Sequence, residues 1–101
     1  GVDRSVLTLQ ERTVKTLYML SFSHGKSTGD GDDILIALPQ AELGKLLAVS
    51  RQNLNRVLKR LAQEGMLTVR YGGVYLHGLE AIRQRYGHLV NVHQPAAVYA
   101  R

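Results

Sequence analysis

The side chains best suited to recognise another molecule lie between Ser50 and Gly65. Five of them would share one helical face, and none is acidic: Arg51, Gln52, Asn55, Arg56 and Lys59. Arginine can form two parallel hydrogen bonds with guanine, and glutamine or asparagine can do the same with adenine. Ser50 can begin the helix by accepting a hydrogen bond from the amide of Asn53, and a helix N-terminus also attracts phosphate. The pattern favours double-stranded DNA as the ligand, read by this helix in the major groove.

A solvated face on an ordinary amphipathic helix is the simpler interpretation of the same segment. Four apolar residues recur at the spacing of one buried stripe, which leaves the polar side in water whatever its function: Leu54, Val57, Leu58 and Leu61. The charge favours the DNA interpretation. The chain carries a net charge of +5, and the stretch from Pro39 to Tyr71 has six basic and two acidic residues, a local balance of +4.

The first third of the chain predicts a helix, a loop and a strand. Thr8 and Glu11 have the spacing of a capping box, so we expect a helix from about Leu9 to His24. The run from Gly25 to Asp33 is rich in glycine and aspartate and lacks apolar residues, which predicts a solvated loop. Ile34 to Leu38 is short, apolar and β-prone, and is expected to be a strand.

A second helix is expected from Pro39, which suits a first helical turn, to about Ala48. It would turn three leucines toward the apolar stripe of the next helix: Leu43, Leu46 and Leu47. Only Ala48, Val49 and Ser50 connect the two helices. So short a connection forces a steep crossing, with Val49 filling the gap between them. Gly65 suits the position just after the last turn, where a positive φ is favoured.

Two strands and a closing helix are expected after Gly65. Leu67 to Arg70 and Val74 to His77 flank Tyr71-Gly72-Gly73, which suits a tight hairpin turn. Leu79 to Tyr86 predicts a short closing helix, and residues 87–101 an irregular tail. The expected fold class is therefore α+β: a winged helix-turn-helix over residues 9–86, with a small three-helix core, a short β-hairpin wing and the closing helix.

The segment from Glu42 to Leu67 resembles the C-terminal DNA-binding domain of Crp/Fnr-family (catabolite activator and fumarate–nitrate regulator-like) bacterial transcription regulators. The similarity is densest in S-R-x-x-L-x-R-x-L-x-x-L-x-x-x-G, from Ser50 to Gly65, and covers about Leu7 to Tyr86. The resemblance implies that Arg51, Gln52 and Arg56 read bases. Asn55 lies on the same helical face and is added to these base-reading positions. The resemblance also implies contacts with DNA phosphates: Ser50, Asn53, Lys59, Gln40, Arg70 and Tyr71. For Tyr71, packing within the hairpin is an equal alternative.

Four positions depart from the pattern of the family. Gln52 stands where an acidic residue usually accepts from cytosine, so the base that it would read differs or is less restricted. Ala48 stands where glycine is usual, at a cost of roughly 1 kcal/mol if that position has a positive φ. Gly44 replaces a common alanine, and Pro39 replaces the usual Ser or Thr cap. None of these changes removes a side chain that would face DNA.

The resemblance implies further parts upstream of this chain. Family members carry a ligand-sensing β-barrel and a long dimerisation helix, of which residues 1–8 are expected to be the remnant or a linker. The Gly-Val start in place of Met is typical of a cut end. We expect no cofactor in this domain, an effector (a cyclic nucleotide is one candidate) in the upstream sensor, and a homodimer in the full-length protein. The expected partners are a roughly two-fold symmetric DNA operator and RNA polymerase.

Other functions find little support in the sequence. Candidate catalytic side chains are scattered, so no enzyme is expected. His88 and His93 lack supporting metal ligands, and the Asp30, Asp32 and Asp33 group lacks the full spacing of a calcium loop. There is no cysteine, no long apolar run and no leader pattern, so we expect a cytoplasmic protein without a membrane partner. The alternative function is a winged helix used for protein–protein or dimer contacts, which would favour apolar or acidic residues on the exposed helix face.

Overall fold

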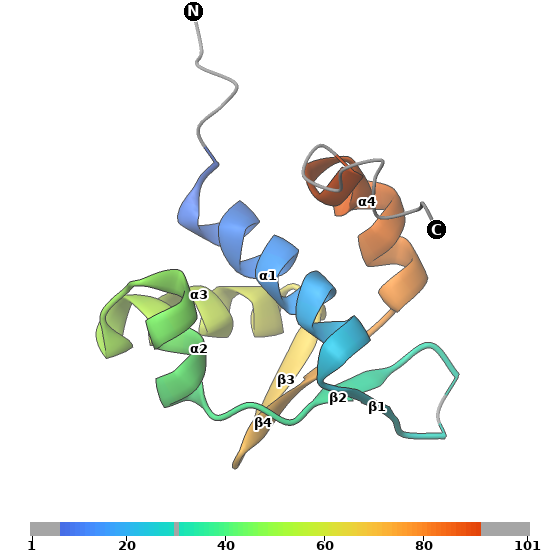
Figure 1. Cartoon of the computed structure of the whole chain (residues 1–101), viewed down its shortest axis with the longest axis horizontal. Helices are drawn as coiled ribbons and strands as arrows, with labels where there is room; N and C mark the ends of the chain where they lie inside the picture. Colours follow the sequence, from blue (N-terminus) through green and yellow to red (C-terminus); the bar gives the residue numbers. More distant parts are fainter. Residues whose placement is uncertain (1–6, 30, 92–101) are drawn as a thin grey trace, which may run out of the picture.

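The computed structural model of the chain describes residues 7–29 and 31–91, and within them it contains four helices and four short strands. In chain order these are α1 (Leu9–Ser23), β1 (Gly25–Ser27), β2 (Ile34–Ile36), α2 (Gln40–Leu47), α3 (Arg51–Gln63), β3 (Leu67–Arg70), β4 (Gly73–Leu76) and α4 (Leu79–Asn91). The helices surround one side of a small antiparallel sheet, and the β3–β4 hairpin forms the wing (Figure 1). The predicted α+β winged helix-turn-helix is confirmed.

The helix boundaries follow local signals in the sequence. The predicted capping box of α1 is present, because Glu11 N donates to Thr8 Oγ1 at 3.0 Å and Thr8 N donates to Glu11 Oε1 at 2.9 Å. Gly65 lies just after α3 with a φ of 79°, as expected for a residue that follows a helix. Pro39 is the N-cap of α2 rather than a residue of its first turn, and its side chain makes no capping hydrogen bond.

The sheet has four strands in the order β1-β2-β4-β3, so it is wider than a hairpin wing. The expectation that Gly25 to Asp33 is all loop was wrong at its start, because Gly25 pairs with Ile36 and Ser27 with Ile34. A β-carbon at Gly25 would lie 2.2 Å from the carbonyl oxygen of Ser21. Only glycine therefore lets the chain leave α1 and enter the sheet at once, and backbone pairing compensates for the missing apolar side chains.

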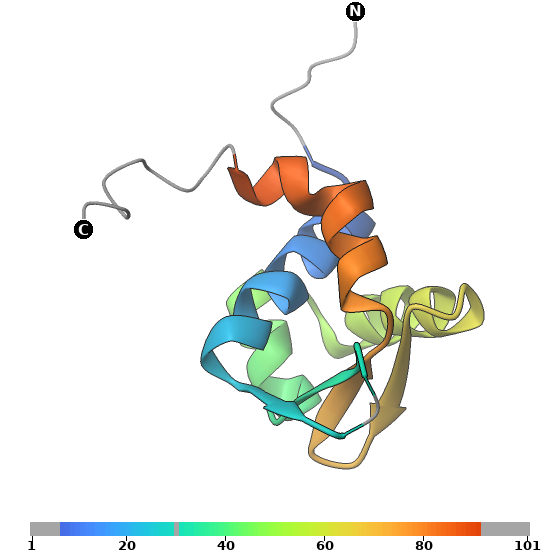
Figure 2. The same cartoon turned by 90° about the vertical axis from the view of Figure 1, so that its right-hand side faces the viewer.

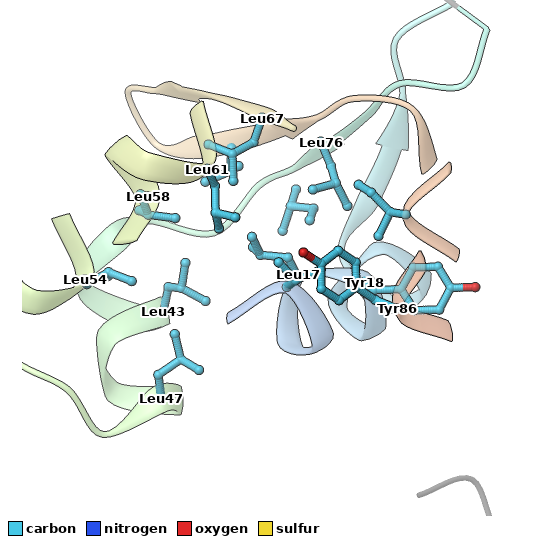
Figure 3. Close-up of a cluster of buried hydrophobic side chains, with 14 residues drawn as sticks. Leu17, Tyr18, Leu43, Leu47, Leu54, Leu58, Leu61, Leu67, Leu76 and Tyr86 are labelled. Carbon is cyan, nitrogen blue, oxygen red and sulfur yellow. The ribbon is translucent and has the colours of Figure 1, made fainter. Parts of the chain in front are cut away.

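Buried aliphatic side chains from α1, α2, α3, the sheet and α4 form one core (Figure 3). Leu54, Leu58 and Leu61 of α3 are each at most 1% exposed, so the predicted apolar stripe is confirmed. On α2 the buried residues are Leu43, Gly44 and Leu47. The expectation that Leu46 packs with them was wrong, because its side chain is 59% exposed. The buried face of α2 therefore runs through Leu43, Gly44 and Leu47, and Leu46 lies outside it.

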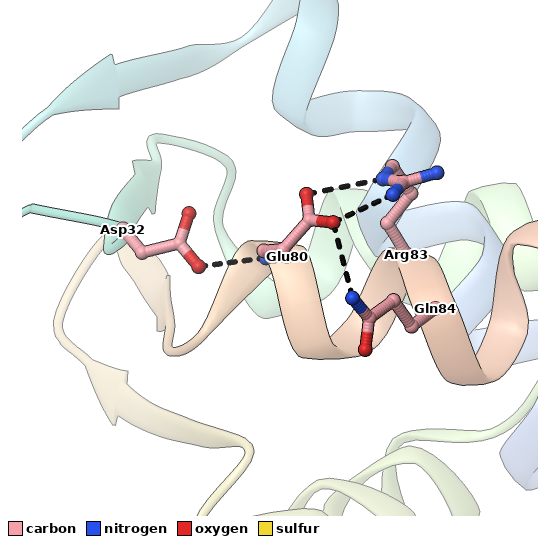
Figure 4. A network of polar contacts seen from close by, with 4 residues as sticks. All are labelled: Asp32, Glu80, Arg83 and Gln84. Carbon is pink, nitrogen blue, oxygen red and sulfur yellow. Dashed lines mark hydrogen bonds and ion pairs between the residues drawn. The ribbon is translucent and has the colours of Figure 1, made fainter.

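Helix α4 is longer than predicted and lies against α1 (Figure 2). It continues to Asn91, so the prediction of an irregular tail from residue 87 onward was wrong for residues 87–91. The rest of the predicted tail, residues 92–101, lies outside the described part of the chain. The first turn of α4 is capped from the loop after β1. Asp32 Oδ2 accepts from Glu80 N at 2.7 Å, and Glu80 in turn holds Arg83 and Gln84 (Figure 4). The acidic part of the predicted loop therefore has a structural role at the start of α4.

Candidate nucleic-acid interface

Helix α3 begins as the sequence predicts. Ser50 has the extended backbone of an N-cap residue, and its Oγ accepts a hydrogen bond from Asn53 N at 3.1 Å. No acidic residue lies in the first turn, so no side-chain carboxylate neutralises the partial positive charge of this helix end. The first turn of α3 is therefore suited to an anionic partner.

The exposed face of α3 carries the predicted contact residues. Each of them is exposed to solvent: Ser50, Arg51, Gln52, Asn53, Asn55, Arg56 and Lys59. The opposite face is anchored in the core by leucines, which fixes the rotation of the helix about its axis. Gln40, at the start of α2, is half-buried. The fold thus leaves every predicted residue of α3 accessible, and their individual roles stay predictions.

An open groove runs along each side of α3. One lies between α3 and strand β3 of the wing, lined by Gln52, Asn55, Arg56, Lys59 and Thr68, among others. The other lies between α3 and α2, lined by Gln40, Lys45, Ala48, Arg51 and Asn55, among others. Arg51 and Gln52 therefore face different grooves, and Asn55 borders both. A helix that protrudes between two grooves has the shape needed to enter the major groove of a duplex.

Asn53 is engaged with Arg56 on the exposed surface. Nη1 of Arg56 donates to Asn53 Oδ1 at 3.2 Å, while the backbone N–H of Asn53 is occupied by Ser50. The carboxamide N–H₂ group of Asn53 is the part that remains suited to donate to a phosphate. The sequence does not reveal this pairing because several neighbouring side chains have the same spacing.

The turn between α2 and α3 has the strained backbone that the sequence suggested. Ala48 has a φ of 57° and is the only non-glycine residue in the described part of the chain with a positive φ. The N–H of Ala48 donates to the carbonyl oxygen of Lys45 at 3.2 Å, and the N–H of Val49 donates to the carbonyl oxygen of Gly44 at 3.1 Å. Arg12 of α1 donates to the carbonyl of Leu47, so the end of α2 is also held from outside the turn.

The tip of the wing presents Tyr71 and Arg70. The side chain of Tyr71 is fully exposed, so packing within the hairpin does not explain this residue. Arg70 lies with its guanidinium carbon 4.9 Å from the ring centroid of Tyr75, on the neighbouring strand. Both predicted wing residues are thus accessible, while their contact with phosphate stays a prediction.

A polar cluster behind the wing was missed from the sequence. Thr68 Oγ1 lies 2.7 Å from His77 Nε2, and His77 Nδ1 lies 3.1 Å from Asp33 Oδ2. Asp33 also accepts from Gly78 N at 3.2 Å. This backbone hydrogen bond, and after it the His77 contact, lowers the pKa of Asp33 from its ordinary value. Alternation in the hairpin places Thr68 and His77 on one face, but no local signal indicates that Asp33 joins them.

Metal and membrane sites gain no support from the described residues. Within residues 7–29 and 31–91, no three His, Asp or Glu side chains gather as metal ligands. Asp32 and Asp33 bond to the start of α4 instead. Asp30, the side chain of His88 and His93 lie outside what the structure describes. No helix in this part of the chain is long and apolar enough to cross a membrane.

A helix-turn-helix whose second helix is basic and exposed, followed by a β-hairpin wing, defines a class of DNA-binding domain. A family model described as the Crp-like helix-turn-helix domain matches residues 11–85, and the chain belongs to this family. The resemblance noted in the sequence is thereby confirmed, and this family consists of transcription regulators rather than enzymes.

Known relatives agree with this assignment. The chain is 35% identical over 69 residues to the anaerobic regulatory protein of Bacillus subtilis (strain 168), and the match covers 67% of the chain and 29% of that protein. Among solved structures, a CRP/FNR-family transcriptional regulator from Thermus thermophilus has a TM-score of 0.71 at 20% identity, with 82% of this chain and 42% of that one covered. Oxidized CprK in complex with o-chlorophenolacetic acid has a TM-score of 0.61 at 26% identity, covering 75% of this chain and 32% of that one. The chain thus spans under a third of the curated regulator that it matches.

Proposed function

We propose that the chain reads specific sequences in double-stranded DNA, with α3 in the major groove. The observation that carries this proposal is the exposed face of α3, which is free of acidic residues and stands between two grooves. Arg51, Gln52, Asn55 and Arg56 would contact base edges. The phosphate contacts would come from the cap, the helix flank, α2 and the wing: Ser50, Asn53, Lys59, Gln40, Arg70 and Tyr71.

We further propose that the domain acts within a dimeric, ligand-responsive cytoplasmic regulator. Two copies would read half-sites about one helical turn apart in a roughly two-fold symmetric operator. The effector would bind upstream of this domain. The complex of CprK with o-chlorophenolacetic acid supports a small organic molecule as the effector, and a cyclic nucleotide is another candidate. RNA polymerase is the proposed partner if the regulator activates transcription.

The alternative is a winged helix that docks onto protein. Such a surface has an apolar centre with few charges. The exposed face of α3 is instead basic and polar, and the exposed apolar side chains Met19, Phe22 and Leu46 lie on α1 and α2. We therefore favour DNA over a protein partner for α3.

Selection from a random duplex pool tests the proposal. The chain is fused to a dimerising coiled coil and used to enrich duplexes, which are then sequenced. The expected result is a symmetric consensus that changes at a single base pair in each half-site with Arg51→Ala, and at a different one with Arg56→Ala. Recovery of no consensus, together with binding that is unchanged in both variants, would contradict the proposal.

A further inference from the structure

A chain of hydrogen bonds links the groove beside α3 to the start of α4. Thr68 lines this groove together with Arg56 and Lys59, and its hydroxyl lies 2.7 Å from Nε2 of His77. The other ring nitrogen of His77 lies 3.1 Å from Asp33. Thr68 is exposed, whereas the side chains of His77 and Asp33 are only about a third exposed, at 34% and 31%. One end of the chain is therefore open to the groove and the other end is held within the fold.

The directions of these hydrogen bonds follow from the chemistry of the groups. An ionised carboxylate only accepts, so Nδ1 of His77 carries the hydrogen in its bond with Asp33. In a neutral imidazole Nε2 is then a bare acceptor, and Thr68 must donate its single hydroxyl hydrogen to it. In a protonated imidazole Nε2 carries a hydrogen and donates to Thr68 Oγ1 instead. Protonation of His77 therefore reverses the bond with Thr68 while the bond with Asp33 keeps its direction.

We propose that Thr68 is a further contact to the DNA backbone, and that protonation of His77 frees its hydroxyl hydrogen to donate to a phosphate oxygen. This inference rests on the proposed function and adds a proton-dependent regulation to the same interface. With His77 neutral, the hydroxyl hydrogen of Thr68 is committed to Nε2, and only oxygen lone pairs face the groove. A phosphate oxygen is itself an acceptor, so it cannot form a hydrogen bond with these lone pairs. With His77 charged, Thr68 donates to the phosphate, and the nearby imidazolium adds a favourable positive charge.

Charged groups from several elements surround this cluster. Arg56 and Lys59 of α3 share a groove with Thr68. Glu64 after α3 and Arg85 on α4 share a groove with His77. Asp32, before β2, is the chain neighbour of Asp33. Carboxylates, lysine and arginine ordinarily keep their charge between about pH 6 and pH 8, whereas imidazole changes its charge there. His77 is the imidazole of this cluster, so replacing it tests whether it carries a change in DNA affinity over that interval.

Binding to a mixed-sequence duplex tests the inference, because a phosphate contact needs no particular sequence. Fluorescence anisotropy of a labelled duplex is measured at fixed ionic strength from about pH 8 to about pH 6. We expect the parent chain to bind about three- to tenfold more tightly at the acidic end, the effect of roughly one net hydrogen bond. Thr68→Val should lose most of this gain and match the parent at the alkaline end, and Thr68→Ser should retain it.

Two further variants separate His77 from the other titrating groups. His77→Gln should bind with nearly constant affinity over the same interval. His24→Gln is the matched control, because the ring of His24 bonds to the neighbouring Ser23 and does not line the groove beside α3. NMR of the His77 ring should also show that protonation occurs at a higher pH with DNA bound, and that this difference is smaller in Thr68→Val.

The outcomes separate this inference from the proposed function. Thermal unfolding at both ends of the pH interval shows whether each variant is folded, and the Thr68→Ser variant tests the hydroxyl even if the Val variant unfolds. A parent affinity that does not change with pH, or an acid-dependent gain that survives in Thr68→Val, would overturn the inference while leaving DNA binding intact. A parent chain that binds no duplex at either pH would contradict the proposed function itself.

Discussion

Nη1 of Arg56 donates a hydrogen bond to Oδ1 of Asn53 at 3.2 Å, from one turn of α3 to the turn before it. The bond ties the guanidinium to the first turn of the helix, and Arg56 keeps other N–H groups that can face a base. Restraining a long side chain before binding saves part of the roughly 0.5–1.5 kcal/mol that its ordering otherwise costs. The pair thus links an expected phosphate contact to an expected base contact.

Replacing either residue of this pair should alter sequence preference. Arg56→Ala is expected to reduce discrimination at one base pair by about 1–3 kcal/mol. Asn53→Ala should cause a smaller loss of discrimination at that same base pair. When Arg56 is already alanine, Asn53→Ala should have almost no effect on this discrimination. Affinities for the selected operator and its single-base variants measure this double-mutant cycle. If Asn53→Ala weakens all duplexes alike in both backgrounds, Asn53 serves only the phosphate.

Lys59→Ala should weaken binding to every duplex by a similar factor. Lys59 lies on the wing side of α3, and removal of one phosphate contact lowers the slope of log K against log salt by about 0.9. The matched control is Arg60→Ala, which removes the same charge from a neighbouring exposed position that lines neither groove of α3. Equal changes of slope in the two variants would show that only overall charge matters.

Ala48→Gly should stabilise the fold. Ala48 has φ and ψ of 57° and 46°, a left-handed conformation that disfavours residues with a β-carbon. Glycine removes this strain but adds entropy to the unfolded chain, so the expected gain is roughly 1 kcal/mol. Chemical denaturation of parent and variant measures the difference in unfolding free energy. A loss of stability would mean that the alanine methyl group makes contacts worth more than the strain.

Gly44→Ala should also be tolerated. A β-carbon at Gly44 would lie 3.5 Å from the carbonyl oxygen of Val49 and 3.7 Å from a methyl carbon of Leu54, which are ordinary contact distances. Alanine is favoured over glycine within a helix by about 0.8–1.0 kcal/mol, so stability should rise by up to that amount. Gly73→Ala is the contrasting variant, because its β-carbon would lie 2.6 Å from the carbonyl oxygen of Ile36. That variant should lose stability in the same denaturation assay.

Acid should destabilise the domain through two carboxylates. The pKa of Asp33 is lowered by the Gly78 amide and His77, and that of Glu80 is lowered by Arg83, from ordinary values of 3.8 and 4.5. Each group binds protons less readily in the folded than in the unfolded chain. Its contribution to stability is therefore present above these ordinary values and is lost as the pH falls through the folded-state values. Denaturation midpoints between pH 7 and pH 2 should fall less steeply in the Asp33→Asn, Glu80→Gln double variant than in the parent, and equal slopes would refute this account.

Elements that depend on neighbours in sequence were predictable. The Thr8 capping box, the Ser50 cap, the Gly65 helix end and the leucine stripe of α3 all follow from residues within about two turns of one another. The exposed face of α3 was predictable for the same reason, because burial of the stripe fixes which side chains remain outside.

Features that depend on distant partners were not predictable. Strand β1 forms because its backbone pairs with β2, and its own residues carry no apolar signal. Leu46 is exposed because the buried face of α2 runs through Gly44 instead, which periodicity alone does not show. The hydrogen bonds among Thr68, His77 and Asp33 join positions up to 44 residues apart, so only the folded chain reveals them.

The aspartates that cap α4 also bear on the order in which the domain folds. Asp32 and Asp33 bond to backbone amides that follow them by 48 and 45 residues. Closing so long a loop is entropically unfavourable, and α4 can gain these caps only after β2 and β4 have paired. The first turn of α4 is therefore expected to form late and to open first, so its amide hydrogens should exchange with solvent faster than those of α1 and α3, which carry their caps within their own sequence.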